Sequence, residues 1–232
     1  MQEDAHAAMN GGVAMGTIVE KHAVESERTA ASGTEAAYRE QVERLRAFHD
    51  YANLVLLPPL VIMDYAYILT QWEPLLFPFF YYTMSYLILD TIFLMVYGYA
   101  HRSPRVVILH HLLICLFSPL PYTMPNLRYA CMVCFSAELN TFALIARRRA
   151  PPNSIWQSIA SIVFVVSWFG IRCIVFPIMV YVFWVLWQNE QAASGNFWHP
   201  SLLAVVIMVA LVVMQYMWTV GLVKKLTSKK YD

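Results

Sequence analysis

The sequence predicts an all-α membrane protein, a polytopic bundle of about six transmembrane helices. Of its 232 residues, 59% are hydrophobic and only 13% are charged, whereas a soluble domain carries roughly 25% charged residues. The hydrophobic residues gather in six long stretches separated by short polar loops. Each stretch can cross a bilayer core of about 30 Å, which takes about 20 helical residues.

Residues 1–37 have the composition of a disordered cytosolic tail. They are rich in Ala, Gly, Ser and Glu and contain hardly an aromatic side chain, so they cannot bury enough apolar surface to fold. They lack the apolar core of a signal peptide, and their glutamates argue against a mitochondrial presequence. We therefore expect the first span to act as the targeting signal.

Residues 38–50 show helical spacing of apolar side chains. Tyr38, Val42, Leu45 and Phe48 recur at this spacing, and charged residues lie between them. This pattern predicts a short helix on the membrane surface. A solvated helical extension of the first span is an equal alternative.

The membrane domain is predicted at residues 51–226. Its six stretches lie at approximately 51–70, 77–100, 105–121, 127–146, 154–187 and 198–223. The third is the shortest and is cut by Pro119 and Pro121, whereas the fifth is too long for one untilted crossing. Pro177 in the fifth stretch predicts a kink, because proline cannot donate the helical hydrogen bond.

The loops predict the topology, since Lys and Arg accumulate on the cytoplasmic side of a membrane. Basic clusters follow alternate spans, and the intervening loops contain no Lys or Arg. The clusters are Arg102 and Arg105 with His101, then Arg147, Arg148 and Arg149, and finally Lys224, Lys225, Lys229 and Lys230. Both termini are therefore predicted to lie in the cytosol.

Residues 227–232 form a cytosolic tail that ends Lys229-Lys230-Tyr231-Asp232. Lysines three and four places from the end resemble the dilysine retrieval signal of endoplasmic reticulum membrane proteins, which is an address and not an anchor. An ordinary positive-inside anchor is the alternative. We expect residence in the endoplasmic reticulum membrane.

Four ionisable residues inside the spans form the candidate site, because such groups are expensive in a bilayer and usually mark function there. With a helical rise of about 1.5 Å per residue, His110 and His111 lie roughly 8 to 9 Å from Arg105 along the helix axis. Glu138 and Asp90 lie on the same, cytosolic side. All four are therefore predicted to share one cavity.

A histidine can act as a base, a nucleophile or an acyl carrier, and a carboxylate can orient it. Adjacent helical residues point about 100° apart, so we expect only one of the two histidines to face the reacting centre. The alternative is that these polar groups only hydrogen-bond the helices together.

Arg172 lies near the middle of the fifth stretch and needs a partner there. Asp64 or Asp90 is the available carboxylate, and we favour a structural charge pair between Arg172 and Asp64. No metal or haem site is expected, because the histidines lack the repeated clusters that such a site requires. The four cysteines are interpreted as small apolar side chains.

The residues from about Tyr81 to Lys225 resemble the TLC-domain family, which includes the ceramide synthases. The resemblance rests on segments in a fixed order: Ser85 to Asp90, then His110-His111, then Ala137 to Thr141 with Arg147, then Phe169, Arg172, Pro177 and Tyr181, and finally Gln215 and Trp218. The sequence Glu138-Leu139-Asn140 has no aspartate, unlike ceramide synthases. This pattern is closest to the smaller TLC-domain-containing proteins.

The resemblance implies a TLC-type helical bundle that acts in membrane lipid homeostasis. In ceramide synthases the paired histidines carry acyl transfer from acyl-coenzyme A, so His110 and His111 would be the reactive pair here. Acyl-coenzyme A is then the expected co-substrate, with no tightly bound cofactor, and membrane lipids are the expected partners. A non-catalytic lipid-binding protein and a membrane scaffold stay open as alternatives, as does a homodimer. A net charge of +1 and the lack of a basic patch exclude nucleic acid as a partner.

Overall fold

The computed structural model describes residues 4–101 and 103–228, and side chains from Glu35 to Lys224. The described residues contain no strand, and six of their helical segments are long and apolar enough to cross a membrane. The predicted all-α class and the six spans are therefore confirmed. The described residues divide into two units, with the boundary between Ala47 and Phe48.

Helix α1 (Asp4–Thr70) begins in the first unit and supplies the first span to the second. Three exposed ion pairs at spacings of three or four residues lie on its segment from Glu35 to Arg46. The backbone of residues 4–37 is helical where composition predicts a disordered tail. Its side chains are described only from Glu35 onward, so the disordered tail and the interfacial placement of residues 38–50 stay predictions.

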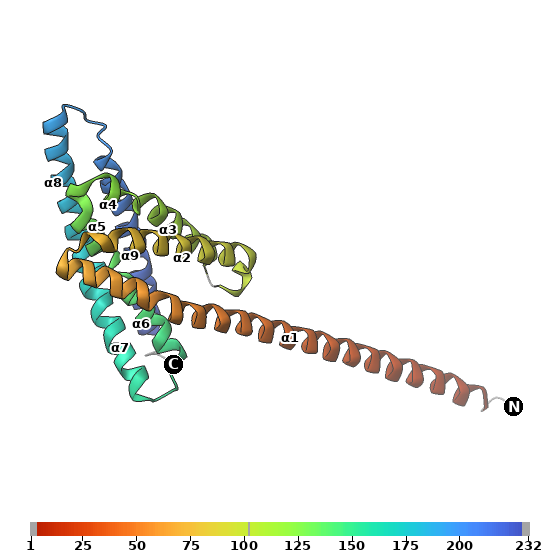
Figure 1. The fold of residues 1–232 in the computed structure, drawn as a ribbon. Helices are drawn as coiled ribbons and strands as arrows, with labels where there is room; N and C mark the ends of the chain where they lie inside the picture. Colours follow the sequence, from red (N-terminus) through yellow and green to blue (C-terminus); the bar gives the residue numbers. More distant parts are fainter. Residues whose placement is uncertain (1–3, 102, 229–232) are drawn as a thin grey trace. The chain divides into compact units, whose positions relative to one another are not determined.

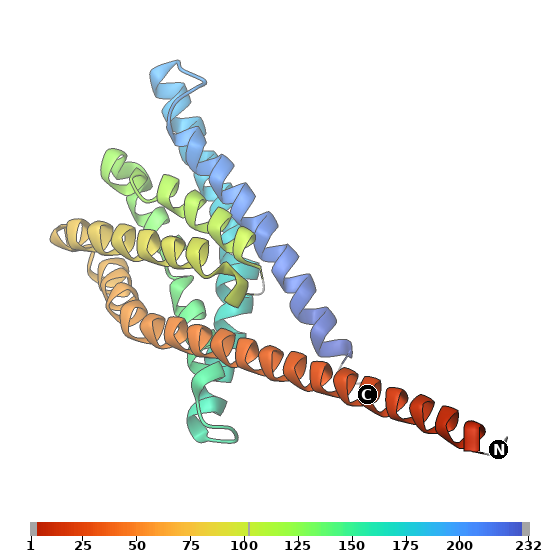
Figure 2. The same ribbon diagram turned by 90° about the vertical axis from the view of Figure 1, so that its right-hand side faces the viewer.

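The second unit is a bundle of helices joined by short connections. Its helices are α2 (Leu76–Val96), α3 (Pro104–Phe117), α4 (Leu120–Thr123), α5 (Arg128–Phe135), α6 (Glu138–Arg149), α7 (Ile155–Ser167), α8 (Phe176–Ser194) and α9 (Ser201–Ser228). Single 3-10 turns precede and follow α2, at Glu73–Leu75 and Gly98–Ala100, and another, Pro125–Leu127, precedes α5. Helices α2 and α3 lie side by side, as do α8 and α9 (Figures 1 and 2).

Two spans are interrupted. In the third, α3 ends at Phe117 and α4 begins after Pro119, because the prolines at 119 and 121 cannot continue the hydrogen-bond ladder. In the fourth, α5 ends at Phe135 and α6 begins at Glu138, although no proline lies between them. Broken helices are tolerated at membrane depth where protein surrounds them, and the fourth span is the most buried of the six.

The fifth span is one long helical segment with a π-helical stretch, η4 (Trp168–Val175), between α7 and α8. Pro177 is the second residue of α8, so its missing N–H falls next to the widened turns. Such π-helical insertions are frequent at functional sites. This one carries Arg172. The loop after α8 begins at Gly195, whose φ of +66° is the left-handed conformation that ends many helices.

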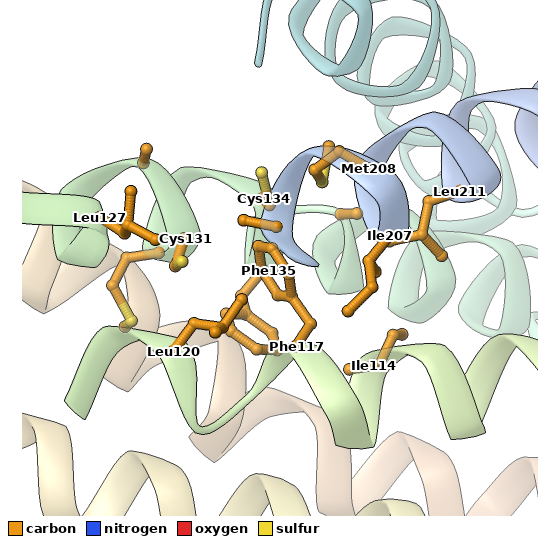
Figure 3. Packing of buried hydrophobic residues seen from close by; sticks show 14 of the residues in the cluster. Ile114, Phe117, Leu120, Leu127, Cys131, Cys134, Phe135, Ile207, Met208 and Leu211 are labelled. Atoms are coloured by element: carbon orange, nitrogen blue, oxygen red, sulfur yellow. The ribbon is translucent and has the colours of Figure 1, made fainter. Parts of the chain in front are cut away.

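The apolar core lies where α3, α5, α8 and α9 meet. Phe117 packs tilted against Phe135 and edge to face against Phe183. Ile207 and Met208 of α9 belong to the same cluster as Phe117 and Phe135 (Figure 3). Large apolar side chains on the outer faces of the helices remain exposed, as expected for surfaces that contact lipid. Lys229 and Lys230, the predicted retrieval signal, lie outside the described residues.

Replacing Phe183 by alanine should lower the free energy of unfolding by about 3 to 5 kcal/mol, because this fully buried ring leaves a cavity against Phe117. Tyr181→Ala, on the exposed face of the same helix, is the matched control and should change it by less than about 0.5 kcal/mol. Dodecyl sulfate titration in mixed micelles measures both. Equal losses for the two variants would contradict this packing.

Candidate functional site

Helix α3 directs its two adjacent histidines to different surroundings. The ring centroids of His110 and His111 are 6.0 Å apart. His110 lines a cavity together with Glu138, whereas His111 faces Asp90 of α2, with its Nε2 atom 3.5 Å from a carboxylate oxygen. The 100° step between helical neighbours explains the division. The four candidate residues thus form two pairs on two sides of α3 and do not line a single cavity.

The cavity with His110 and Glu138 is small and otherwise apolar. It holds about one water molecule in this conformation. Its lining consists of His110, Ile114, Phe117, Cys134, Phe135, Ala137, Glu138, Phe176 and Leu211. Five helices thus converge on one histidine and one carboxyl group.

His110 keeps an available ring nitrogen. Its Nδ1 atom is buried and has no hydrogen-bond partner among the described residues. The indole ring of Trp218 from α9 packs against the imidazole edge to face, with centroids 5.4 Å apart. This contact holds the imidazole without engaging Nδ1.

Glu138 owes its position to the break in the fourth span. It is the first residue of α6 and is buried, at a helix N-terminus where the helix dipole favours a carboxylate. The hydroxyl of Ser136 turns back and donates to the carbonyl oxygen of Val133 (2.6 Å), which stabilises the end of α5. The break therefore delivers a carboxyl group to the centre of the bundle.

Arg172 of η4 binds the residues on both sides of Glu138. Its Nη2 atom donates to the carbonyl oxygen of Ala137 (3.3 Å) and to the hydroxyl of Thr141 (3.1 Å). Its Nη1 atom donates to Oε1 of Gln215 on α9 (2.7 Å). Arg172 also attracts Glu138 electrostatically. One guanidinium thus joins the fifth span to the fourth and sixth.

The predicted charge pair between Arg172 and Asp64 is wrong. Asp64 is fully buried on α1, and neither carboxylate oxygen has a hydrogen-bond partner within the described part of the chain. The two Nη atoms of Arg172 donate instead to Gln215, Ala137 and Thr141, all three of them uncharged groups that a search for opposite charges overlooks.

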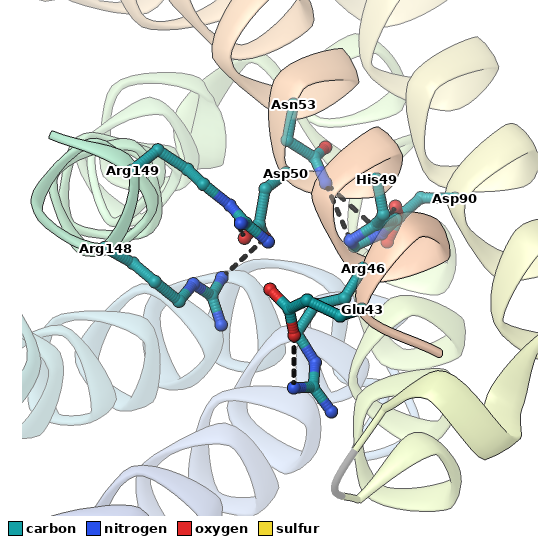
Figure 4. Close-up of polar contacts among 8 residues, drawn as sticks. All are labelled: Glu43, Arg46, His49, Asp50, Asn53, Asp90, Arg148 and Arg149. Atoms are coloured by element: carbon teal, nitrogen blue, oxygen red, sulfur yellow. Dashed lines mark hydrogen bonds and ion pairs between the residues drawn. The ribbon is translucent and has the colours of Figure 1, made fainter. Parts of the chain in front are cut away.

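On the other side of α3, Asp90 bridges two histidines. One of its oxygens lies 2.5 Å from Nε2 of His49 on α1, and the other faces His111. Asn53, one turn along α1, contacts the His49 ring at 3.2 Å (Figure 4). The Phe93 ring stacks on the same imidazole. Nδ1 of His111 lies 3.1 Å from the hydroxyl of Thr91. Both ring nitrogens of His111 therefore have partners.

The sequence interpretation missed His49 as a member of this cluster. It lies before the first hydrophobic stretch and was therefore assigned to the interfacial segment. The available signal was the spacing of His49 and Asn53, which places two polar side chains on one face of a helix.

Asp50 forms a second polar connection from α1. Its two carboxylate oxygens accept hydrogen bonds from Arg148 (2.7 Å) and Arg149 (2.6 Å) at the end of α6 (Figure 4). Asp50 is 1% exposed. The arginines that predict topology thus also bind a buried carboxylate.

Other groups contribute little to the site. An open hollow near the start of α9 is lined by Glu190, His199 and Ser201 among others, and contains none of the predicted site residues. The described residues contain no group of three His, Cys, Asp or Glu side chains placed to hold a metal ion.

Comparison with known families gives one match. The family model for the TLC domain matches residues 54–224, which is most of the chain. The comparisons with curated proteins and with solved structures found no match.

Replacing Asp64 by leucine should leave the free energy of unfolding unchanged or raise it by up to about 2 kcal/mol, because two buried, unpaired oxygens are removed. Asp50→Leu, on the same helix, should lower it by about 3 kcal/mol, because Arg149 loses its buried partner. Dodecyl sulfate titration separates the two. Strong destabilisation by Asp64→Leu would contradict this expectation and indicate that Asp64 forms an ion pair in the folded protein.

A double-mutant cycle of His49→Gln and Asp90→Asn should give a coupling energy of about 1 to 2 kcal/mol, because their contact is short and largely buried. A cycle of His199→Gln with Asp90→Asn is the control, because His199 lines the separate open hollow, and it should give less than about 0.5 kcal/mol. Unfolding free energies of the single and double variants supply both values. Equal coupling energies in the two cycles would contradict a specific contact between His49 and Asp90.

Proposed function

Because this chain belongs to the TLC-domain family of multi-pass membrane proteins, we propose that it transfers acyl groups to a lipid amine or alcohol within the bilayer. Family membership links the chain to lipid metabolism or sensing. The finer proposal makes His110 the general base and acyl-coenzyme A the acyl donor.

One observation carries this assignment. His110 has an available Nδ1 atom beside a cavity that also contains Glu138. A general base needs a nitrogen within reach of the proton that it removes. His111 meets this requirement less well, because both of its ring nitrogens already have polar neighbours.

The proposed step is balanced without a further reactant. His110 takes the proton from the acceptor's N–H or O–H group as its nitrogen or oxygen attacks the thioester carbonyl. The tetrahedral intermediate then collapses, the C–S bond breaks, and the departing thiolate of coenzyme A takes the proton from His110. Glu138 stabilises the transient imidazolium electrostatically. Burial beside the donor gives the acceptor the proximity that the step requires.

The His49, Asp90 and His111 cluster supports His110 indirectly in this proposal. Asp90 fixes His111, and His111 precedes α3 residues that pack in the core. The cluster thereby holds α3 in the rotation that turns His110 toward Glu138. These are positioning residues.

The size of the cavity adds one requirement. Space for about one water molecule does not admit an acyl chain. Substrate entry must therefore separate the helices that line the cavity, and the breaks between α3 and α4 and between α5 and α6 are places where helices can move.

The apolar lining of the same cavity favours a second candidate function, which also requires the lining helices to separate. A protein that senses a lipid by closing around its acyl chain needs no turnover, and the polar residues then hold the lipid's polar end. For either function we propose the endoplasmic reticulum membrane and cytosolic termini. The alternating basic loops and the terminal lysines support this location.

Replacing His110 by alanine should reduce acyl transfer at least about 100-fold, the usual contribution of a general base. His111→Gln should reduce it less than about tenfold, and His199→Ala, in the open hollow, should leave it unchanged. The assay is mass spectrometry of lipids formed by the purified chain in nanodiscs with acyl-coenzyme A and mixed lipid amines and alcohols.

The outcomes separate the two functions. Transfer that persists in His110→Ala would contradict the assignment of the base. A wild-type protein that forms no product, but co-purifies with a lipid that His110→Ala loses, would favour sensing over transfer.

A further inference from the structure

Two hydrogen-bond donors beside the cavity have no acceptor. They are Nε of Arg172 and Nε2 of Gln215, and neither has a partner among the residues whose side chains are described. Arg172 is 5% exposed and Gln215 is 1% exposed. An unpaired buried donor costs about 1 to 3 kcal/mol. The two side chains hydrogen-bond to each other, and a bound acceptor group would remove this cost.

The contacts of Arg172 fix which atoms are left over. Its Nη1 atom donates to Gln215, so the oxygen of that amide faces Arg172 and the nitrogen faces elsewhere. Its Nη2 atom is used by Ala137 and Thr141. The nitrogen atoms left without a partner, one on each side chain, can only donate, so the missing group must accept hydrogen bonds.

These donors and the cavity belong to one region. Phe176, four residues after Arg172, and Leu211, four residues before Gln215, both line the cavity. Ala137, whose carbonyl oxygen binds Arg172, lines it as well. The next turn of α9 after Gln215 carries Trp218, which packs on His110.

Charge and polarity then restrict the missing group. Glu138 lies in sequence between Ala137 and Thr141, which both bind Arg172, so a further anion would be buried close to this carboxyl group at a cost in free energy. A neutral acceptor oxygen remains. The cavity beside it has an apolar lining, which suits a hydrocarbon chain once the helices that line it have separated. A lipid acyl group combines both features in its carbonyl oxygen and its chain.

We propose that Arg172 and Gln215 bind the carbonyl oxygen of a lipid acyl group, whether ester, amide or thioester. The inference rests on the proposed function in one respect, namely that the bound acyl group is the one transferred. In that reaction the carbonyl oxygen gains negative charge as the acceptor attacks. The two donors are then placed to stabilise it, which is the usual role of an oxyanion site.

Direct binding tests the carbonyl site without turnover. The purified full chain in nanodiscs of diether phospholipid, which has no carbonyl group, receives methyl palmitate labelled with ¹³C at the carbonyl carbon. Hexadecyl methyl ether is the matched probe without a carbonyl. Isotope-edited infrared spectroscopy reports hydrogen bonding as a shift of the ¹³C=O stretch to lower wavenumber, and a titration gives both affinities.

The wild-type chain should bind the ester about fivefold or more tightly than the ether, as expected for one or two hydrogen bonds, and should show the shifted band. Gln215→Glu keeps the acceptor for Arg172 but removes the free donor, so it should weaken ester binding about fivefold and reduce the shift. Arg172→Lys keeps the charge, loses Nε–H and should do the same. Thr83→Val, which removes a buried, unpaired hydroxyl from α2, is the control and should change neither.

Equal binding of ester and ether by the wild-type chain, or an unshifted band, would overturn the inference even if a variant fails to fold. An unchanged shift in folded Gln215→Glu and Arg172→Lys would also overturn it. A shifted band without acyl transfer would support the carbonyl site and refute the transfer function. Acyl transfer without a shifted band would refute the carbonyl site and support the transfer function.

Discussion

A positive charge buried in the bundle needs acceptors, and the guanidinium of Arg172 reaches three of them by joining three spans. It binds the carbonyl oxygen of Ala137 at the break of the fourth span, Thr141 beyond the break, and Gln215 in the sixth. Each contact limits how these helices pack. The position of Glu138 follows, because it lies between two of the bound residues. The cavity, the break and the π-helical stretch are thus parts of one arrangement.

This arrangement gives two adjacent histidines different chemistry. His110 turns to the cavity with an available nitrogen, and His111 turns to Asp90 and, through it, to His49. The His49, Asp90 and His111 cluster joins α1, α2 and α3. The cavity with His110 and Glu138 joins α3 to the later helices. A single substitution in α3 is therefore expected to act either on the reacting centre or on the packing that positions it, depending on which histidine it changes.

The sequence predicts the fold well, because apolar length and loop charge are averages over many residues. The site depends on individual orientations and is less predictable. The 100° step predicts that His110 and His111 diverge, but nothing in the sequence indicates a break at Ser136, where no proline lies. Charge matching paired Arg172 with Asp64, because neutral partners such as Gln215 leave no signal in a count of charges.

The central claim is that His110 and His111 face different carboxyl groups. Solid-state NMR on the chain in nanodiscs, with ¹⁵N-histidine and ¹³C-carboxyl aspartate, measures the dipolar couplings between imidazole nitrogens and aspartate carboxyl carbons. The account predicts couplings from Asp90 to His49 and His111, of which His111→Gln removes one and His110→Gln removes none. A coupling between aspartate and His110, or the loss of an Asp90 coupling in His110→Gln, would contradict it.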